Sequence, residues 1–403
     1  MNKKLIALAL AALPAAAMAD VTLYGTIAGG IESIKTYNGN ASGFMGNLQS
    51  GQLQSRTEVN DWVSNIGFKG TEDLGNGLKA IWQVESRLNI DGSASPTVNG
   101  QSSGSGTFAT RDSFLGLAGD WGKFRLGYIS DYANSDMEQV DPGHYSNNGG
   151  AGNGGAVSVG GLAMFTRIDS RHKNALRYDS ANWGGFSFAA LWAADEARTK
   201  TVAGQATNNQ FFNLGLSYEN SGFFGKYNYG RWGDSELVST PKDWHRLEAG
   251  YNANNIYVAL GFQQARGYLN VTTNGTLVTN IVDSGVLYNA NQVAANLAGV
   301  NAQNSGLGKA ASGSYLARSR ELALTGGYTF GAFTPYLSYA KGYNINLSNY
   351  GDVSNSGYDQ WVLGLDYALS KRTDVYTSYG HVNWKTQGAQ NESSFGLGLI
   401  HRF

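Results

Sequence analysis

The chain has 403 residues, a formal net charge of −1 and no cysteine, and it contains 55 glycines but only 5 prolines. Charged residues make up 15% of the chain and aromatic residues 12%, while the mean hydropathy is −0.29. This composition excludes a collagen, a coiled coil, a charged disordered tail and a bundle of apolar membrane helices. The absence of cysteine excludes disulfides and thiol chemistry, and the balanced charge leaves no basic footprint for nucleic acid.

Residues 1–19 have the pattern of a secretory signal peptide. Two lysines precede an apolar run over 5–13, and Ala-Met-Ala at 17–19 is a typical cleavage site. The apolar run is shorter than the ~20 residues that a membrane-spanning helix needs, so we interpret it as a leader and not as an anchor. The sequence therefore predicts a signal peptide over 1–19 and one domain over 20–403.

Most of the remaining chain alternates between apolar and polar residues, which is the period of a β-strand with one apolar face. The same phase recurs over 20–33, 78–88, 212–218 and 246–251. The last strand is the clearest case, because its apolar face carries Phe395, Leu397, Leu399, His401 and Phe403. A soluble β-sandwich also alternates, so this pattern alone does not place the strands in a membrane.

Three further features favour a barrel in a membrane. The predicted strands run to about 9–12 residues, the length that a tilted strand needs to cross a bilayer. Aromatic residues cluster near predicted strand ends, as at 183–192 and 223–229, which suits girdles at the two membrane interfaces. Short turns alternate with long polar loops such as 129–170 and 265–318, as expected for periplasmic turns and external loops.

We therefore predict an all-β fold, a transmembrane antiparallel β-barrel of sixteen strands with long external loops. A barrel of this size encloses an aqueous channel, whereas eight strands would be filled by side chains. The predicted strands are 20–33, 57–70, 78–88, 110–119, 123–129, 171–181, 186–193, 211–219, 223–231, 244–252, 256–264, 318–330, 333–341, 358–369, 373–382 and 393–403.

Several segments spread over the chain match a known family: DVTLYG at 20–25, SNIGFKGTEDLGNGLKAIWQVE at 64–85, RDSFLGL at 111–117, NALRYD at 174–179 and LSKRT at 369–373, with the terminal Phe403. Through them the chain resembles the general, non-specific porins of Gram-negative bacteria, of the neisserial, beta-proteobacterial type. The segment 64–85 is the most specific of these matches. The chain differs from the family pattern in the third long loop, 129–170. This loop lacks the family's Pro-Glu-Phe-type segment and carries SNNGGAGNGG at 146–155.

The resemblance implies a homotrimer of sixteen-stranded barrels in the cell outer membrane, surrounded by outer-membrane lipid and lipopolysaccharide. It implies a water-filled channel for passive diffusion of ions and small hydrophilic solutes, with no cofactor. The third long loop, called loop 3 below, is expected to fold into the lumen as a constriction. The terminal Phe403 resembles the signal that the outer-membrane assembly machinery reads. Small apolar strand faces such as Gly25, Ile27 and Gly29 could pack against a neighbouring subunit.

Candidate residues for the pore constriction come from the strand phase. A few charges facing one another across confined water decide what passes a channel. The phase places a basic wall in the lumen, made by Lys69, Lys79, Arg87, Arg125, Lys173 and Arg177, and loop 3 could supply an acidic wall through Asp131, Asp136, Glu138 and Asp141. Arg111 is ambiguous, because the phase of its strand points it outward unless the strand is bulged. The alternative is that all of these are ordinary solvated charges of a wide lumen.

Other functions remain as alternatives. A substrate-specific facilitator is favoured only by the aromatic richness, which girdles explain more simply. A barrel enzyme would need a placed Ser/His or Asp/His constellation, and the Gly-Gln-Ser-Ser-Gly at 100–104 lies in a Ser/Gly-rich loop. The five histidines lack metal-ligand spacing, so we expect no metal site and no catalytic residue. The long loop at 265–318 could add an adhesive role.

Overall fold

The computed structural model describes residues 20–37, 53–62, 64–92, 108–137, 139–143, 161–196, 198, 200, 204, 206–234, 241–274, 277–282, 313–348, 350–385 and 390–403. The predicted leader at 1–19, the glycine-rich run at 146–155 and Glu138 lie outside these residues.

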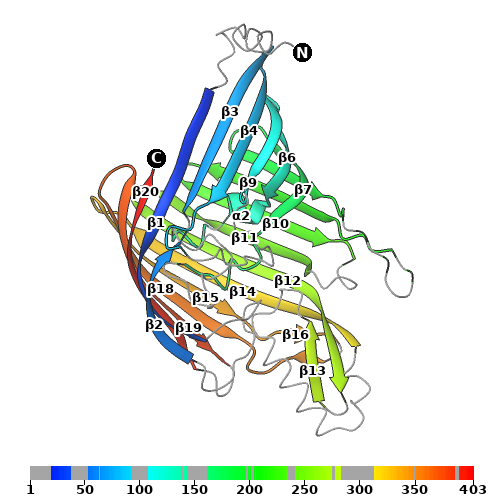
Figure 1. Cartoon of the computed structure of the whole chain (residues 1–403). Coiled ribbons are helices and arrows are strands. Elements are labelled where there is room, and N and C mark those ends of the chain that lie inside the picture. The colour runs from blue at the N-terminus through cyan, green and yellow to red at the C-terminus, as the bar shows by residue number, and fades with distance from the viewer. Residues whose placement is uncertain are drawn as a thin grey trace.

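One antiparallel sheet contains every described strand, and one short helix, α2 (Tyr132–Asp136), follows β6 (Figure 1). The strands are β1 (Asp20–Tyr37), β2 (Leu53–Asp61), β3 (Asn65–Gly75), β4 (Leu78–Arg87), β5 (Ser113–Gly119), β6 (Gly122–Ser130), β7 (Arg171–Ser180), β8 (Phe186–Ala193), β9 (Phe211–Asn220), β10 (Phe223–Trp232), β11 (Pro241–Ala253), β12 (Ile256–Asn274), β13 (Leu277–Val282), β14 (Gly313–Tyr328), β15 (Phe333–Gly342), β16 (Asn346–Leu347), β17 (Gly351–Asp352), β18 (Tyr358–Ala368), β19 (Thr373–Trp384) and β20 (Glu392–Arg402).

The sheet closes into a barrel because β1 pairs with β20, so the first and last strands lie side by side (Figure 1). β2 and β3 pair with successive stretches of β1 and together form one strand of the wall. β13, β16 and β17 are short additions that extend β12 and β14. The wall therefore has sixteen antiparallel strands, and the predicted fold class is confirmed.

The wall strand formed by β2 and β3 is interrupted between Asp61 and Asn65, and the Ser64 side chain replaces backbone hydrogen bonds of the ladder there. The Ser64 hydroxyl accepts a hydrogen bond from the Ala28 amide at 2.9 Å and donates one to the Ala28 carbonyl at 3.2 Å. The interruption places Trp62 against Tyr376, with their ring centroids 4.9 Å apart. Alternation could not predict this break, because both flanking strands keep their own period of two.

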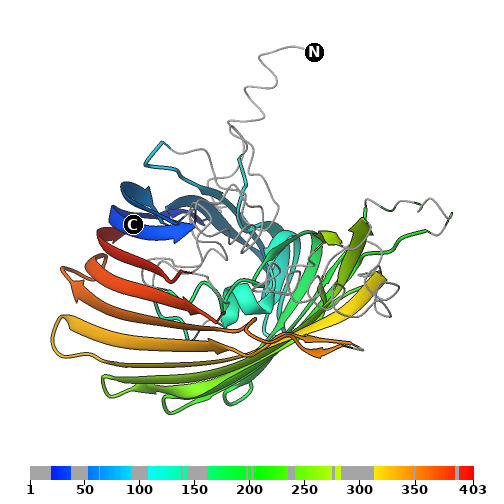
Figure 2. The same ribbon diagram turned by 90° about the horizontal axis from the view of Figure 1, so that it is seen from below.

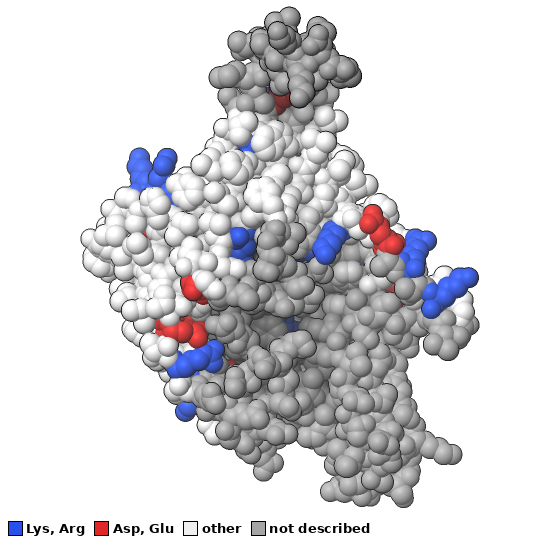
Figure 3. Space-filling view, viewed as in Figure 1, with Lys and Arg blue, Asp and Glu red and all other residues white. Residues whose placement is uncertain are grey.

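The two faces of the wall differ as expected for strands in lipid. On β20, Leu397 is 50% exposed although Ser394, on the opposite face, is only 1% exposed. The same arrangement, with large apolar residues pointing outward and small or polar residues pointing inward, recurs on other wall strands. On the side of the molecule that Figure 3 shows, most of the described surface is uncharged. Exposed apolar residues on most of the wall strands are unfavourable in water and favourable in a bilayer.

Tight turns join the strands at one end of the barrel. Asn76 and Gly77 have φ of 53° and 78°, and Asn254 and Asn255 have φ of 53° and 65°, the left-handed backbone that two-residue hairpin turns require. The described strand ends that flank the long connections lie at the other end of the barrel. Within the described residues, no helix is long and apolar enough to cross a membrane.

Candidate functional site

Helix α2 opens loop 3 and lies on the inner side of the curved sheet (Figure 2). Asp131 caps the helix, because its Oδ1 accepts a hydrogen bond from the Asn134 amide at 2.9 Å. The Tyr132 amide donates to Asn213 Oδ1 on β9 at 3.0 Å. The Tyr132 ring lies over Gly215, where an added Cβ would meet the ring at 2.0 Å. A glycine at this position therefore lets the helix approach the wall.

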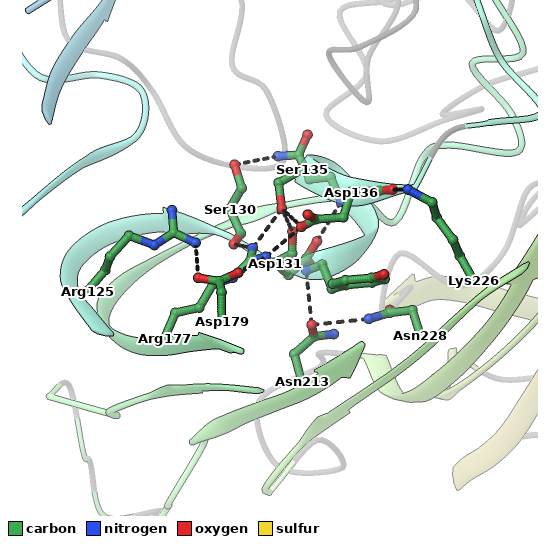
Figure 4. Close-up of polar contacts among 12 residues, drawn as sticks. Arg125, Ser130, Asp131, Ser135, Asp136, Arg177, Asp179, Asn213, Lys226 and Asn228 are labelled. Atoms are coloured by element: carbon green, nitrogen blue, oxygen red, sulfur yellow. Dashed lines mark hydrogen bonds and ion pairs between the residues drawn. The ribbon is translucent and has the colours of Figure 1, made fainter. Parts of the chain in front are cut away.

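Four charged side chains join α2 to the wall, and we call Arg125, Asp136, Arg177 and Asp179 the α2 cluster. Arg177 on β7 binds Asp136 at 2.5 Å and Asp179 at 2.8 Å. Arg125 on β6 binds Asp179 at 2.6 Å (Figure 4). Strand register explains why these side chains lie close together, because Arg125 and Arg177 are directly opposite each other on the neighbouring strands β6 and β7.

Further hydrogen bonds hold α2 in place. Arg177 also donates to the Ser135 hydroxyl at 2.6 Å and to the Ser130 carbonyl at 2.8 Å. From β10, Lys226 donates to the Asp136 carbonyl at 2.7 Å (Figure 4). Lys226 also forms an ion pair with Glu219 at 2.8 Å. Burial raises the pKa of the Tyr132 phenol, so this side chain stays neutral against the wall.

A second group of arginines, which we call the arginine row, consists of Arg87, Arg111 and Arg171. Arg87 lies 3.8 Å from Asp61, Arg111 binds Glu85, and Arg171 binds Asp112 at 2.7 Å. Burial alone would raise the pKa of the Asp112 carboxyl, but the charge of Arg171 and a hydrogen bond from Ser130 hold that pKa below its ordinary value. All three guanidinium groups have carboxylate partners.

The arginine row resolves the ambiguity of Arg111. β5 begins only at Ser113, and the Arg111 amide donates to the Glu85 carbonyl at 3.0 Å. Glu85 is on the inward face of β4, because its Oε2 accepts a hydrogen bond from the hydroxyl of Tyr24 on β1 at 2.8 Å. Arg111 therefore points inward with Glu85.

The remaining predicted basic residues do not join either group. Lys69 and Lys79 are exposed, and the Lys69 ammonium lies 5.1 Å from the centroid of the Tyr24 ring. The inward placement of Lys173 is wrong. A bulge pairs Gly127 with Ala175 but Ile129 with His172, so His172 takes the inward position.

The acids of loop 3 have three different surroundings. Asp131 is buried and lies 3.2 Å from His172 Nε2, so it is a helix cap and not an open charge. Asp136 contacts Arg177 directly and does not face it across an opening. Asp141 is buried and accepts a hydrogen bond from the Leu162 amide at 2.9 Å.

The sequence pattern did not predict a buried polar contact between the end of loop 3 and strands β11, β12 and β14. Arg167 binds Glu321 on β14 at 2.6 Å, and Arg246 on β11 binds Asp169 at 2.5 Å. We call these two ion pairs the latch. Gln263 on β12 donates to the Phe165 carbonyl at 3.0 Å, which brings a third strand into the contact. The available signal was a charged residue at an inward position, and it was clearest at Glu321, which stands between the small inward residues Ser319 and Ala323.

No group of three or more histidine or acidic side chains that could hold a metal ion occurs in the part of the chain that the structure describes. A closed barrel with an apolar outer face and charged inner face defines a transmembrane channel. The model of the Gram-negative porin family matches residues 5–387. The chain therefore belongs to the Gram-negative porin family, and it is an outer-membrane porin.

Relatives and solved structures agree with this membership. The major outer membrane protein P.IB of Neisseria sicca is 37% identical, and that of Neisseria meningitidis serogroup B is 34% identical; both alignments cover 100% of each chain. The anion-selective porin from Comamonas acidovorans has a TM-score of 0.60 at 17% identity, covering 96% of this chain and 100% of its own. Salmonella typhi OmpF, in complex with daunomycin, has a TM-score of 0.59 at 17% identity, covering 96% and 98%.

The predicted family, fold and location are thus confirmed. As a porin, the chain forms a water-filled channel across the outer membrane, through which ions and small hydrophilic solutes diffuse. The high aromatic content was the one feature that favoured a substrate-specific facilitator. Many of these rings face outward, as do Phe186 and Tyr218, whose ring centroids lie 4.4 Å apart.

Proposed function

We propose that loop 3 narrows the lumen of this porin and that the α2 cluster and the arginine row line its narrowest section. The observation that carries the proposal is the 2.5 Å contact between Arg177 on the wall and Asp136 on α2. It ties the loop to the basic side of the barrel. The charges at this section then act on passing ions through confined water, where they are weakly screened.

The proposed filter is electrostatic and passive. Guanidinium groups from β4–β7 line one side of the passage, and the exposed Lys69 and Lys79 extend it. Such an arrangement orients dipolar solutes and slows large apolar ones. The members of the family are channels, and we infer that this chain likewise acts as a channel and not as an enzyme.

We further propose that the porin is a homotrimer. A Vibrio cholerae OmpT with the same fold, at a TM-score of 0.56 and 12% identity, is described in a trimer form. In this chain, Gly25, Ile27 and Gly29 lie on the outward face of β1. The Phe403 ring of the same chain already covers Gly25, so the low surface around Ile27 and Gly29 is the part that a neighbouring barrel could approach closely.

Phe403 is proposed as the signal for the outer-membrane assembly machinery. In the finished barrel its amide and carbonyl exchange hydrogen bonds with Gly25 at 3.1 and 3.2 Å. Its ring lies against Gly25, where a Cβ would come within 2.6 Å. The residue that the machinery would read in the unfolded chain thus becomes part of the seam that closes the barrel.

A planar bilayer tests the constriction. The purified protein is inserted, and the reversal potential is measured across a salt gradient for the natural chain, Arg87→Ala and Arg125→Ala. Each variant removes a positive charge from the proposed passage, so the reversal potential should move toward cation preference. The control is Lys385→Ala, because Lys385 pairs with Asp359 on the outer face of the barrel. If the reversal potential shifts equally in the control, or does not shift in the two arginine variants, Arg87 and Arg125 are ordinary solvated charges of the lumen and do not form a constriction.

A further inference from the structure

A bulge in β7 turns the side chain of His172 toward the inside of the barrel. Asn174 adopts a φ of 55°, and the pairing of β7 with β6 shifts by one residue between Gly127 and Ile129. Without the shift, Lys173 would face the lumen and His172 would face lipid. The bulge therefore exchanges an inward lysine for an inward histidine.

The His172 ring packs against aromatic rings of two other wall strands. It stacks on Phe211 of β9, with centroids 3.8 Å apart and planes 12° apart, and lies 5.4 Å from the ring of Trp232 on β10. Phe211 in turn stacks on Trp244 of β11 at 5.3 Å. The His172 side chain is 4% exposed. The stack therefore fixes the plane of the imidazole and leaves it little room to rotate.

The polar partner of His172 is the residue that caps α2. His172 Nε2 lies 3.2 Å from Asp131 Oδ2, and the Asp131 side chain is fully buried. An ionised carboxylate only accepts hydrogen bonds, so Nε2 carries the hydrogen. The other oxygen, Oδ1, accepts from the Asn134 amide at 2.9 Å. One carboxylate thus joins the ring on the wall to the first turn of the helix.

The charges near this contact have partners of their own. In the described part of the chain, Asp131 is the one acid that forms an ion pair with His172. Arg171, next to His172 on β7, binds Asp112 at 2.7 Å, and Arg177 donates to the Ser130 carbonyl at 2.8 Å. The residues that β9 and β10 pack against the imidazole are uncharged rings.

From the end of loop 3, Ile168 joins the apolar cluster that contains Phe211. The two residues that flank Ile168, Arg167 and Asp169, are held in the latch. Among the described residues, the imidazole is therefore the one ionisable cation that forms an ion pair with the Asp131 carboxylate.

Helix α2 depends on contacts of this kind because it is only five residues long. A helix of this length has too few internal hydrogen bonds to be stable by itself. The Ser135 amide donates to the Asp131 carbonyl at 3.1 Å, so Asp131 holds the first turn through its main chain as well. The end of the same helix carries Asp136, which contacts Arg177 (Figure 4). A stronger contact at Asp131 therefore holds the whole helix more firmly against the wall.

We propose that His172 is a positioning residue for α2, and that protonation of its ring strengthens the attachment of the helix to the wall. Histidine is the side chain whose charge ordinarily changes between about pH 5 and pH 8. The neutral ring donates a hydrogen bond to the Asp131 carboxylate, and the protonated ring adds a positive charge beside that buried anion. The helix is then held more firmly in acid than in neutral medium. The consequence for the current rests on the proposed function, since it requires that α2 narrows the lumen.

Hydrogen exchange measures the attachment of α2 directly. The full chain in detergent is exchanged at about pH 5.5 and about pH 8, and peptides covering 131–137 are followed by mass spectrometry. Each variant is compared with the natural chain at the same pH, so that the intrinsic exchange rate cancels. His172→Gln keeps a donor at the place of Nε2 but does not titrate. At the lower pH it should exchange about fivefold faster than the natural chain, and at the higher pH the two should agree within about twofold.

Two further variants separate the contact from packing. Asp131→Asn keeps a good helix cap but removes the carboxylate, so it should lose the same acid-dependent protection. The matched control is His245→Gln on β11. The His245 ring also packs against an aromatic side chain, 4.9 Å from Tyr229, but it lies on the outward face with Leu247, which is 51% exposed. The control should exchange like the natural chain at both pH values.

The single-channel current is recorded at the same two pH values as a second readout. Open-channel noise should fall on acidification in the natural chain and should stay constant in His172→Gln. If the exchange of 131–137 depends on His172 as expected but the noise does not change, His172 positions α2 and the constriction assigned to loop 3 is wrong.

Two results overturn the role of His172 and leave the constriction standing. In one, His172→Gln exchanges like the natural chain at both pH values. In the other, it exchanges faster by the same factor at both, which is the result expected if the ring contributes packing alone. An equal effect in His245→Gln also overturns the proposal. The difference in gel mobility between unheated and heated protein checks that each variant forms the barrel.

Discussion

Arg167 and Glu321 form an ion pair of 2.6 Å between loop 3 and β14, and both side chains are almost fully buried. The Tyr358 hydroxyl donates to the same carboxylate at 2.6 Å, and Gln263 donates to it at 3.0 Å. A carboxylate in this position is costly to leave without its cation, because the neutral donors offset only part of the lost solvation. The latch therefore holds the end of loop 3 through buried ion pairs. Removing only one partner of such a pair destabilises the fold, because the other charge is left buried and unpaired.

We expect Arg167→Met to destabilise the folded barrel by up to about 3–5 kcal/mol. The reason is the unpaired Glu321 carboxylate, so the double variant Arg167→Met/Glu321→Leu should recover part of the lost stability. The stability of each variant is measured in detergent as the fraction of protein with folded gel mobility at increasing temperature. As a control, Arg402→Met removes a more exposed pair with Asp374 and should cost about 1 kcal/mol or less. Equal losses in the two single variants would show that burial of the latch is unimportant.

The approach of α2 to the wall depends on Gly215. An alanine Cβ there would meet the Tyr132 ring at 2.0 Å, so Gly215→Ala should push α2 away from β9 and alter single-channel conductance. The double variant Gly215→Ala/Tyr132→Ala removes the clashing ring and should bring the conductance back toward that of Tyr132→Ala alone. Gly326→Ala is the matched control, since nothing lies within 4 Å of its added Cβ. An unchanged conductance in Gly215→Ala would mean that α2 does not limit the channel.

The barrel itself could be predicted because alternation is a local signal with a strong physical cause. The predicted strand over 186–193 coincides with β8, and the predicted 393–403 differs from β20 by one residue at each end. Inward placement of Arg125 and Arg177 followed from the same phase. These are positions where one face meets lipid over the whole strand, so that a slip by one residue would bury charge in the membrane.

The rest depended on interactions that alternation does not contain. Lys173 was misplaced because Asn174 adopts a φ of 55° and the bulge shifts the phase by one residue. Asp136 was predicted to face the basic wall across the lumen, but a five-residue helix brings it into contact with Arg177. The latch joins Arg167 to a strand 154 positions further along the chain. Such pairings depend on the path of loop 3 in space, which has no period in the sequence.

Asp136 supplies a prediction whose sign is opposite to that of the arginine variants. Asp136→Asn removes a carboxylate that is 37% exposed in its side chain and keeps the size of the residue, so the positive charge of Arg177 is less compensated. The reversal potential across a salt gradient should therefore move toward anion preference. The shift should shrink between 0.1 M and 1 M salt, where the screening length falls from about 10 Å to about 3 Å. A shift toward cations would place Asp136 outside the conducting path.

The seam between Gly25 and Phe403 links closure of the barrel to the proposed assembly signal. Deleting the Phe403 side chain in Phe403→Ala should lower the amount of folded protein in the outer membrane severalfold, whereas the same purified chain should still refold in detergent, because the backbone hydrogen bonds to Gly25 remain. Phe395→Ala is the matched control: Phe395 points outward from the same strand and is 51% exposed, yet it is not terminal. Folded protein in membranes is quantified by unheated gel mobility. If both variants fail equally in cells and in detergent, the terminal ring contributes packing, and recognition by the assembly machinery is not its role.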